Sequence, residues 1–221
     1  MSLFQRLFGK RGFHRFADSF TRTREAKFAN LQRWVQTQSE QGRHVLVLAH
    51  FESTFLEAQA AIQQSGFDFE ILARPQSQQQ LVRTLYGSPA GITITMSQML
   101  APSEEPEYRE AVDLHIAMMI TERYPLVERD VRLEDFARSL AARVNMGYLM
   151  SFEDPVIRRL LGDRFIFLME QLGLGENDLV QSAMTERALQ QRIRRATQSV
   201  VDEQEAGSPE QWLEVNMPVS K

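Results

Sequence analysis

The stretch HVLVLAHF, residues 44–51, decides the fold class of this chain. It is a short unbroken run of apolar residues, which is typical of a strand that is buried on both faces of a parallel sheet. Comparable runs follow at FDFEILA (67–73), GITITM (91–96), AVDLHIAMMI (111–120) and GYLMSF (147–152), with helical spacing of apolar residues between them. Strands that alternate with helices of this length indicate right-handed βαβ units. We therefore expect a three-layer α/β domain with a mostly parallel sheet of about five strands.

The composition is that of an ordinary globular protein. The 221 residues are 43% hydrophobic and 24% charged, and the formal net charge is −4. This charge argues against attraction of the whole surface to nucleic acid. The chain has no cysteine, which excludes a disulfide framework, a thiol nucleophile and a thiolate zinc site. No apolar run approaches the roughly 18 residues of a membrane span, and no secretory signal pattern is present, so we expect a cytoplasmic location.

The two ends of the chain have patterns of their own. Residues 1–21 form a basic, phenylalanine-rich arm that we expect to be an amphipathic segment. Its contact candidates are Leu3, Phe4, Arg6, Leu7, Phe8, Lys10 and Arg11. Such an arm could bind an anionic membrane reversibly through residues 1–16 or dock on the protein's own surface. Residues 176–203 have the apolar spacing of a long helix, and residues 204–221 are polar and expected to be a flexible tail, with the region of Trp212 as the exception.

Several short motifs follow the strand at 147–152 in a fixed order. They are Ser151-Phe152-Glu153-Asp154, the pair Arg158-Arg159, Gly162, LMEQLGL (168–174), GEND (175–178) and MTERALQQRIRRA (184–196). This order resembles the end of the second nucleotide-binding domain of SecA, the preprotein-translocase motor ATPase family. Upstream, residues 24–54 and DLHIAMMITER (113–123) resemble the opening elements and a later strand of the same domain. The resemblance implies a RecA-like domain over 22–175 and, over 176–203, the start of the family's scaffold helix; another superfamily-two helicase relative is the alternative.

The chain departs from this family where the family binds nucleotide. No G-x-x-x-x-G-K-[ST] phosphate-binding loop occurs in the sequence. After GITITM, the family has an Ala-Gly-Arg-Gly-Thr-Asp turn, whereas this chain has SQMLAP (97–102). The family's arginine cluster is best matched by EDFARSLAARVN (134–145), which keeps only Arg138 and Arg143 as vestigial candidates for nucleotide contact. We interpret both as exposed arginines on a helix, and we expect no bound cofactor and no ATP hydrolysis by this chain alone.

Other candidate sites have weaker patterns. The histidines His14, His44, His50 and His115 lack metal-ligand spacing, so no metal site is expected. His50 stands at a predicted strand end, where it could be a general base, although a hydrogen-bonded structural role is favoured. Asp154 before Pro155 predicts a helix start. No Ser/His/Asp arrangement is visible in the sequence. Arg192, Arg194 and Arg195 form a basic face on the last helix, either solvated or in contact with phosphates or an acidic partner.

Together these patterns favour a catalytically inactive SecA-like domain that acts as a protein-interaction or accessory module. Its expected setting is protein translocation at the cytoplasmic face of the membrane, and its expected partner is a translocation component or a P-loop ATPase. One alternative is half of a split ATPase that supplies Arg143 in trans to a P-loop partner. A second alternative is a nucleic-acid-binding remnant of a helicase, which the net charge does not favour.

Overall fold

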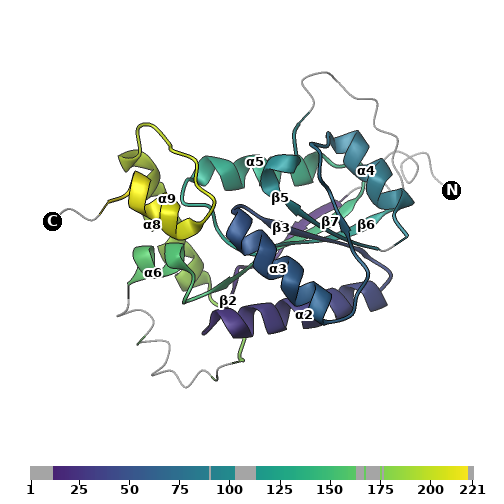
Figure 1. Cartoon of the computed structure of the whole chain (residues 1–221), viewed down its shortest axis with the longest axis horizontal. Helices are drawn as coiled ribbons and strands as arrows, with labels where there is room; N and C mark the ends of the chain where they lie inside the picture. The colour runs from purple at the N-terminus through teal and green to yellow at the C-terminus, as the bar shows by residue number, and fades with distance from the viewer. Residues whose placement is uncertain are drawn as a thin grey trace.

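The computed structural model describes residues 12–89, 91–102, 113–162, 167, 175 and 177–218 (Figure 1). The strands are β1 (Gly12–Arg15), β2 (Ser19–Thr21), β3 (His44–Ala49), β4 (Glu70–Ile71), β5 (Ile92–Met96), β6 (His115–Ile120), β7 (Arg143–Ser151) and β8 (Val180–Gln181). The helices are α2 (Arg24–Glu40), α3 (Glu52–Gln64), α4 (Gln78–Gly87), α5 (Val127–Ser139), α6 (Pro155–Leu161), α8 (Ala183–Ser199) and α9 (Pro209–Asn216), with a 3₁₀ turn η1 at Ser97–Met99.

The sheet has the strand order β4-β5-β3-β6-β7-β2-β8, and β1 also pairs with β7. All pairings among the described strands are parallel except the one between β2 and β8. The strand β3 lies in the centre, and the chain moves from it to β4 and β5 on one side and then to β6 and β7 on the other. This arrangement confirms the predicted fold class, an α/β domain with a mostly parallel sheet and a C-terminal helical extension. The five expected strands are β3 to β7.

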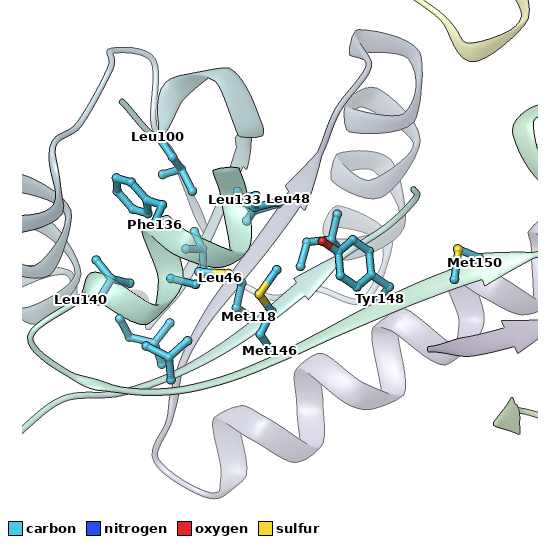
Figure 2. Close-up of a cluster of buried hydrophobic side chains, with 14 of the residues drawn as sticks. Leu46, Leu48, Leu100, Met118, Leu133, Phe136, Leu140, Met146, Tyr148 and Met150 are labelled. Carbon is cyan, nitrogen blue, oxygen red and sulfur yellow. The ribbon is translucent and has the colours of Figure 1, made fainter. Parts of the chain in front are cut away.

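Helices cover both faces of the sheet, with α2 and α3 on one side and α4 and α5 on the other (Figure 1). Side chains of β3 alternate between the two layers because successive residues of a strand point to opposite faces. Val45 and Val47 pack with α2 and α3, whereas Leu46 and Leu48 pack with α4 and α5. Figure 2 shows the cluster that contains Leu46 and Leu48. In this cluster Met118 of β6 and Met146 of β7 lie between the sheet and α5. This two-sided burial is what the unbroken apolar run predicts.

The second half of the predicted arm at residues 1–21 docks on the protein's own surface, which is one of the two alternatives for this segment, and it does so as strands. Residues 12–21 form β1 and β2, which lie one after the other along the edge of β7. Phe20 is fully buried and stacks on Phe152 with ring centroids 5.4 Å apart. The reason is the unpaired backbone groups along the edge of β7, which β1 and β2 satisfy. The contact candidates Leu3, Phe4, Arg6, Leu7, Phe8, Lys10 and Arg11 lie outside the described residues.

The C-terminal region also differs from its prediction. The long helix begins at Ala183 rather than near residue 176, because Val180 and Gln181 pair with β2 as β8. The expected flexible tail at 204–221 instead contains α9. Trp212 of α9 is fully buried and packs against Tyr124 at a centroid distance of 6.0 Å. The burial of Trp212 against Tyr124 therefore packs a segment of largely polar composition onto the domain.

The Ser-Phe-Glu-Asp motif ends β7 at a buried ion pair. Nζ of Lys27, on α2, is 2.6 Å from Oδ1 of Asp154 and also donates to the backbone oxygen of Thr121. The other carboxylate oxygen of Asp154 accepts the backbone N–H of Ser151. Lys27 is fully buried. The pair thus joins α2 to the ends of β6 and β7, and it explains the acidic residue before Pro155 as a structural group, as predicted.

Replacing Lys27 by Met should lower the free energy of unfolding by about 3–5 kcal/mol, because it leaves the Asp154 carboxylate buried without its counter-ion. Urea denaturation followed by circular dichroism measures this change. Arg33→Met, on the exposed side of the same helix, is the matched control and should change stability by less than about 0.5 kcal/mol. Equal stability of the wild-type protein and Lys27→Met would contradict the structural role of the ion pair.

Candidate functional site

The carboxyl ends of β3, β5 and β6 surround a cavity of about 770 Å³. Because the chain leaves the central strand β3 toward opposite sides of the sheet, this edge is a topological switch point, where open α/β sheets bind ligands. The cavity is lined by the β3–α3 connection, the η1 turn, the first half of α5 and the C-terminal segment 205–211. Its volume lies within the range of small-molecule sites, roughly 300–1,000 Å³.

Three polar side chains meet in this region. The ring of His50, which follows β3, has Nδ1 2.8 Å from Oγ of Ser97 and Nε2 3.0 Å from Oδ1 of Asp130. Ser97 is the first residue after β5, and Asp130 lies in the first turn of α5. His50 and Ser97 both line the cavity, whereas Asp130 lies behind the ring. The geometry is therefore that of a Ser–His–Asp chain, an arrangement that the sequence did not reveal.

The charge state of Asp130 fixes the roles of the two imidazole nitrogens. Burial alone would raise the pKa of the Asp130 carboxyl, but the Arg123 guanidinium and the hydrogen bond from His50 hold this pKa below its ordinary value. An ionised carboxylate only accepts hydrogen bonds, so Nε2 of His50 carries the proton. In the neutral form of the ring, Nδ1 is then the acceptor nitrogen, and it faces the hydroxyl group of Ser97. This is the protonation pattern of a general base.

Arg123, directly after β6, holds Asp130 in place. Its Nη1 is 3.0 Å from Oδ2 of Asp130, and its Nη2 and Nε contact both carboxylate oxygens of Asp18 at 2.8–3.1 Å. The guanidinium carbon lies 3.5 Å from the centroid of the Tyr148 ring. Arg15 adds a second cation to Asp18 at 2.6 Å. The group that orients His50 is thus anchored by a buried network that reaches the β1–β2 connection.

Glu122 fixes the backbone on which His50 stands. Its Oε1 accepts the backbone N–H groups of His50 and Phe51 at 2.8 and 3.0 Å, and its Oε2 accepts the hydroxyl group of Thr54 at 2.8 Å. Helix α3 has no side-chain cap of its own, so Glu122 satisfies donors at the start of that helix from β6. The Thr-Glu-Arg motif of the sequence therefore positions the histidine loop through Glu122 and the aspartate through Arg123.

The C-terminal segment forms one wall of the cavity. The backbone oxygen of Gly207 accepts the N–H of Ser53 in the first turn of α3, at 3.0 Å. Glu203 accepts the indole N–H of Trp212 and pairs with Arg129 of α5, each at 3.0 Å. The hydroxyl group of Tyr124 also bonds to Glu203. These contacts hold the segment against the first turns of α3 and α5.

The two arginines that were the vestigial candidates for nucleotide contact lie away from the cavity. Arg143 is the first residue of β7 rather than part of a helix, so it lies at the amino edge of the sheet, opposite the carboxyl edge. It is half-exposed and 3.2 Å from Oδ1 of Asp113. Arg138 is on α5, as predicted, with its guanidinium carbon 4.2 Å from the centroid of the Phe13 ring. Arg192, Arg194 and Arg195 are exposed on α8.

Sequence reasoning assigned no function to the loop SQMLAP, and it favoured a structural role for His50. The signal that could have found the site is positional: His50, Ser97 and the Thr-Glu-Arg motif each directly follow a strand of the parallel sheet. Carboxyl ends of parallel strands meet at one edge, so these residues were bound to lie near one another. The position of Asp130 could not be found in this way, because it depends on how α5 packs.

Two other kinds of feature are missing from the described part of the chain. No group of three or more His, Asp or Glu side chains there is arranged to hold a metal ion. Within the same ranges, no helix has the length and apolar character needed to cross a bilayer.

Comparisons with known proteins show similarity to a solved structure but assign the chain to no family. No protein-family model matches the chain, and no curated protein matches it. Among solved structures, the crystal structure of the C-terminal part of the Fun30 ATPase domain matches 76% of this chain and 53% of that chain. The TM-score is 0.41 and the sequence identity is 13%. This chain thus spans about half the length of that structure, and similarity at this level assigns no activity.

Glu122→Gln should remove a pH-dependent loss of stability. Burial raises the pKa of the Glu122 carboxyl above 4.5, and nearby positive charge and hydrogen bonds oppose this rise only in part. The native state therefore keeps a proton that the unfolded chain releases, so this carboxyl costs stability as pH rises above 4.5. The cost is about 1.4 kcal/mol for each unit by which the pKa is raised.

Gln keeps an acceptor oxygen for the amide groups but cannot ionise. Urea denaturation at pH 5 and pH 8 should show that the variant loses less unfolding free energy between these values than the wild-type protein. Glu40→Gln, on the exposed end of α2, is the control and should follow the wild-type pH dependence. A parallel pH dependence for Glu122→Gln and the wild-type protein would contradict the assignment.

Proposed function

We propose that this chain is a SecA-like RecA domain that does not turn over ATP by itself and serves as a protein-interaction or accessory module. The observation that carries the proposal is that Arg123 is buried and bonded to two carboxylates. This arginine of the Thr-Glu-Arg motif is 5% exposed, and its donors are directed at Asp18 and Asp130. Turning it toward a phosphate would leave Asp130 buried without its arginine and Asp18 with Arg15 alone, at a cost of about 3–5 kcal/mol for a broken pair.

The remaining charges around the cavity also favour a domain that does not act on a triphosphate. Its cations are Arg129, which is paired with Glu203, and Arg132, which has no ion-pair partner among the described residues. Glu52 and Glu205 line the same cavity. Phosphoryl transfer requires several cations or a metal ion around the phosphates. Arg132, with Glu52 and Glu205 in the same cavity, does not supply this positive charge.

The translocation setting of the proposal rests on the resemblance of residues 22–201 to SecA. In this setting the module binds a translocation component or a P-loop ATPase, and residues 1–11 supply a basic, apolar segment for reversible contact with an anionic membrane. The split ATPase has less support, because Arg143 lies at the amino edge of the sheet and is paired with Asp113.

Isothermal titration of the purified chain with Mg-ATP should give no binding up to millimolar concentration, and a phosphate-release assay should give no turnover. A P-loop ATPase in the same buffer is the positive control. Steady phosphate release by the chain would overturn the proposal. If weak binding is observed, comparison of Arg132→Ala with Arg138→Ala distinguishes binding in the cavity from binding to the exposed surface.

Co-purification of the full chain from its native cells in mild detergent should enrich a translocation component or a P-loop ATPase. Arg143→Ala should leave this enrichment and any turnover by the partner unchanged, because the accessory module does not use Arg143 for chemistry. Arg83→Ala, an exposed arginine of α4, is the matched control. Stimulation of a partner's ATP turnover that Arg143→Ala alone abolishes would instead favour the split enzyme.

A further inference from the structure

The contacts of His50 amount to more than a structural hydrogen bond. Both ring nitrogens have side-chain partners, Ser97 at 2.8 Å and Asp130 at 3.0 Å, and the ring is largely buried. Ser97 itself is partly exposed and lines the cavity of about 770 Å³. A hydroxyl group that faces a ligand-sized cavity while bonded to a carboxylate-anchored imidazole is the arrangement that activates a serine.

We propose that Ser97, His50 and Asp130 form a nucleophilic site that hydrolyses carboxylic esters of small apolar acids. This activity is separate from the proposed accessory function and does not depend on it. Ser97 and His50 are the catalytic residues. Asp130 acts through the imidazole and is a positioning residue.

The reaction follows from the hydrogen bonds. Oγ of Ser97 attacks the ester carbonyl carbon, while Nδ1 of His50 takes the hydroxyl proton and Asp130 stabilises the resulting imidazolium through Nε2–H. The tetrahedral intermediate collapses by breaking the bond to the alcohol oxygen, which receives the proton from His50. Water, deprotonated by the same nitrogen, then attacks the acyl-serine and releases the carboxylic acid and free Ser97.

In the usual serine–histidine–aspartate triad, Nε2 of the histidine faces the serine and Nδ1 faces the carboxylate. In this chain Nδ1 faces the serine and Nε2 faces the carboxylate. The chemistry tolerates this exchange, since a neutral imidazole has one donor nitrogen and one acceptor nitrogen whichever way it is oriented. The orientation is set by Glu122, which holds the backbone of His50, and by Arg123, which holds Asp130.

The cavity wall indicates the class of substrate. Phe51, Leu100 and Leu133 give it apolar surface on the sheet side. The side-chain amide of Gln98, next to Ser97, also lines the cavity and can donate to the developing oxyanion. Glu52, Arg129, Arg132 and Glu205 also line the cavity, so its wall is mixed. An uncharged acyl chain of a few carbons can pack against the apolar groups.

A fluorophosphonate probe tests the nucleophile directly, because it forms a covalent bond only with an activated serine. The full-length wild-type protein should gain one probe mass, and peptide mapping should place it on Ser97. Ser97→Ala should abolish labelling, and His50→Gln should slow it by about 10²- to 10⁴-fold. The controls Ser65→Ala, at the exposed end of α3, and His115→Gln, at the amino end of β6, should be labelled at the wild-type rate. Circular dichroism of each variant confirms that it is folded.

Turnover of p-nitrophenyl butyrate distinguishes the positioning residue from a structural one. Asp130→Asn keeps the shape of the side chain but not its charge, so kcat should fall by about 10²- to 10⁴-fold while KM stays within about twofold of the wild-type value. Labelling of the wild-type protein at a serine other than Ser97, equal labelling of wild-type protein and His50→Gln, or turnover no faster than that of Ser97→Ala would each overturn the proposal.

Discussion

The buried guanidinium of Arg123 between Asp18 and Asp130 is the interaction on which the rest of the structure depends. Taking charges out of water costs several kcal/mol for each ion, and this cost is offset only where the geometry satisfies every group. Here Arg123 reaches both carboxylates and lies on the face of Tyr148, while Arg15 adds a second cation to Asp18. The β1–β2 connection, the end of β6, the first turn of α5 and the middle of β7 must all be in place for these contacts to exist. The network therefore couples the edge strands to the orientation of His50.

The central part of the fold could be predicted because its cause is local in the sequence. A strand covered by helices on both faces needs apolar residues at every position, and HVLVLAHF shows this without reference to any other part of the chain. The edge strands could not be predicted in the same way. β2 and β8 have three and two residues, and they exist because neighbouring strands offer unpaired backbone groups. Trp212 is similar: its burial depends on the space beside Tyr124, which no pattern within residues 204–221 reveals.

The candidate site was predicted less well than the fold. Comparison of SQMLAP with a glycine- and arginine-rich turn directed attention to the groups that were missing from the loop, and Ser97 was passed over. Asp130 stands in a run of charged residues, VERD, that is typical of a solvated helix face, yet its side chain is buried. Only the packing of α5 against the carboxyl edge brings it to His50. Arg143 shows the opposite error, because a helical reading of residues 134–144 hid the start of β7 and with it the edge of the sheet on which this arginine lies.

The pairing of β1 and β2 with β7 has a consequence for how the chain is made. The register joins Gly12 to Arg143 and Ser19 to Leu149, so β1 and β2 are synthesised well before the strand that completes them. Contacts between residues so far apart along a chain form slowly. Until β7 is synthesised, the nascent polypeptide presents short strands without neighbours, and such edges pair readily with other chains. Synthesis of β7 thus ends the period in which β1 and β2 lack their parallel neighbour.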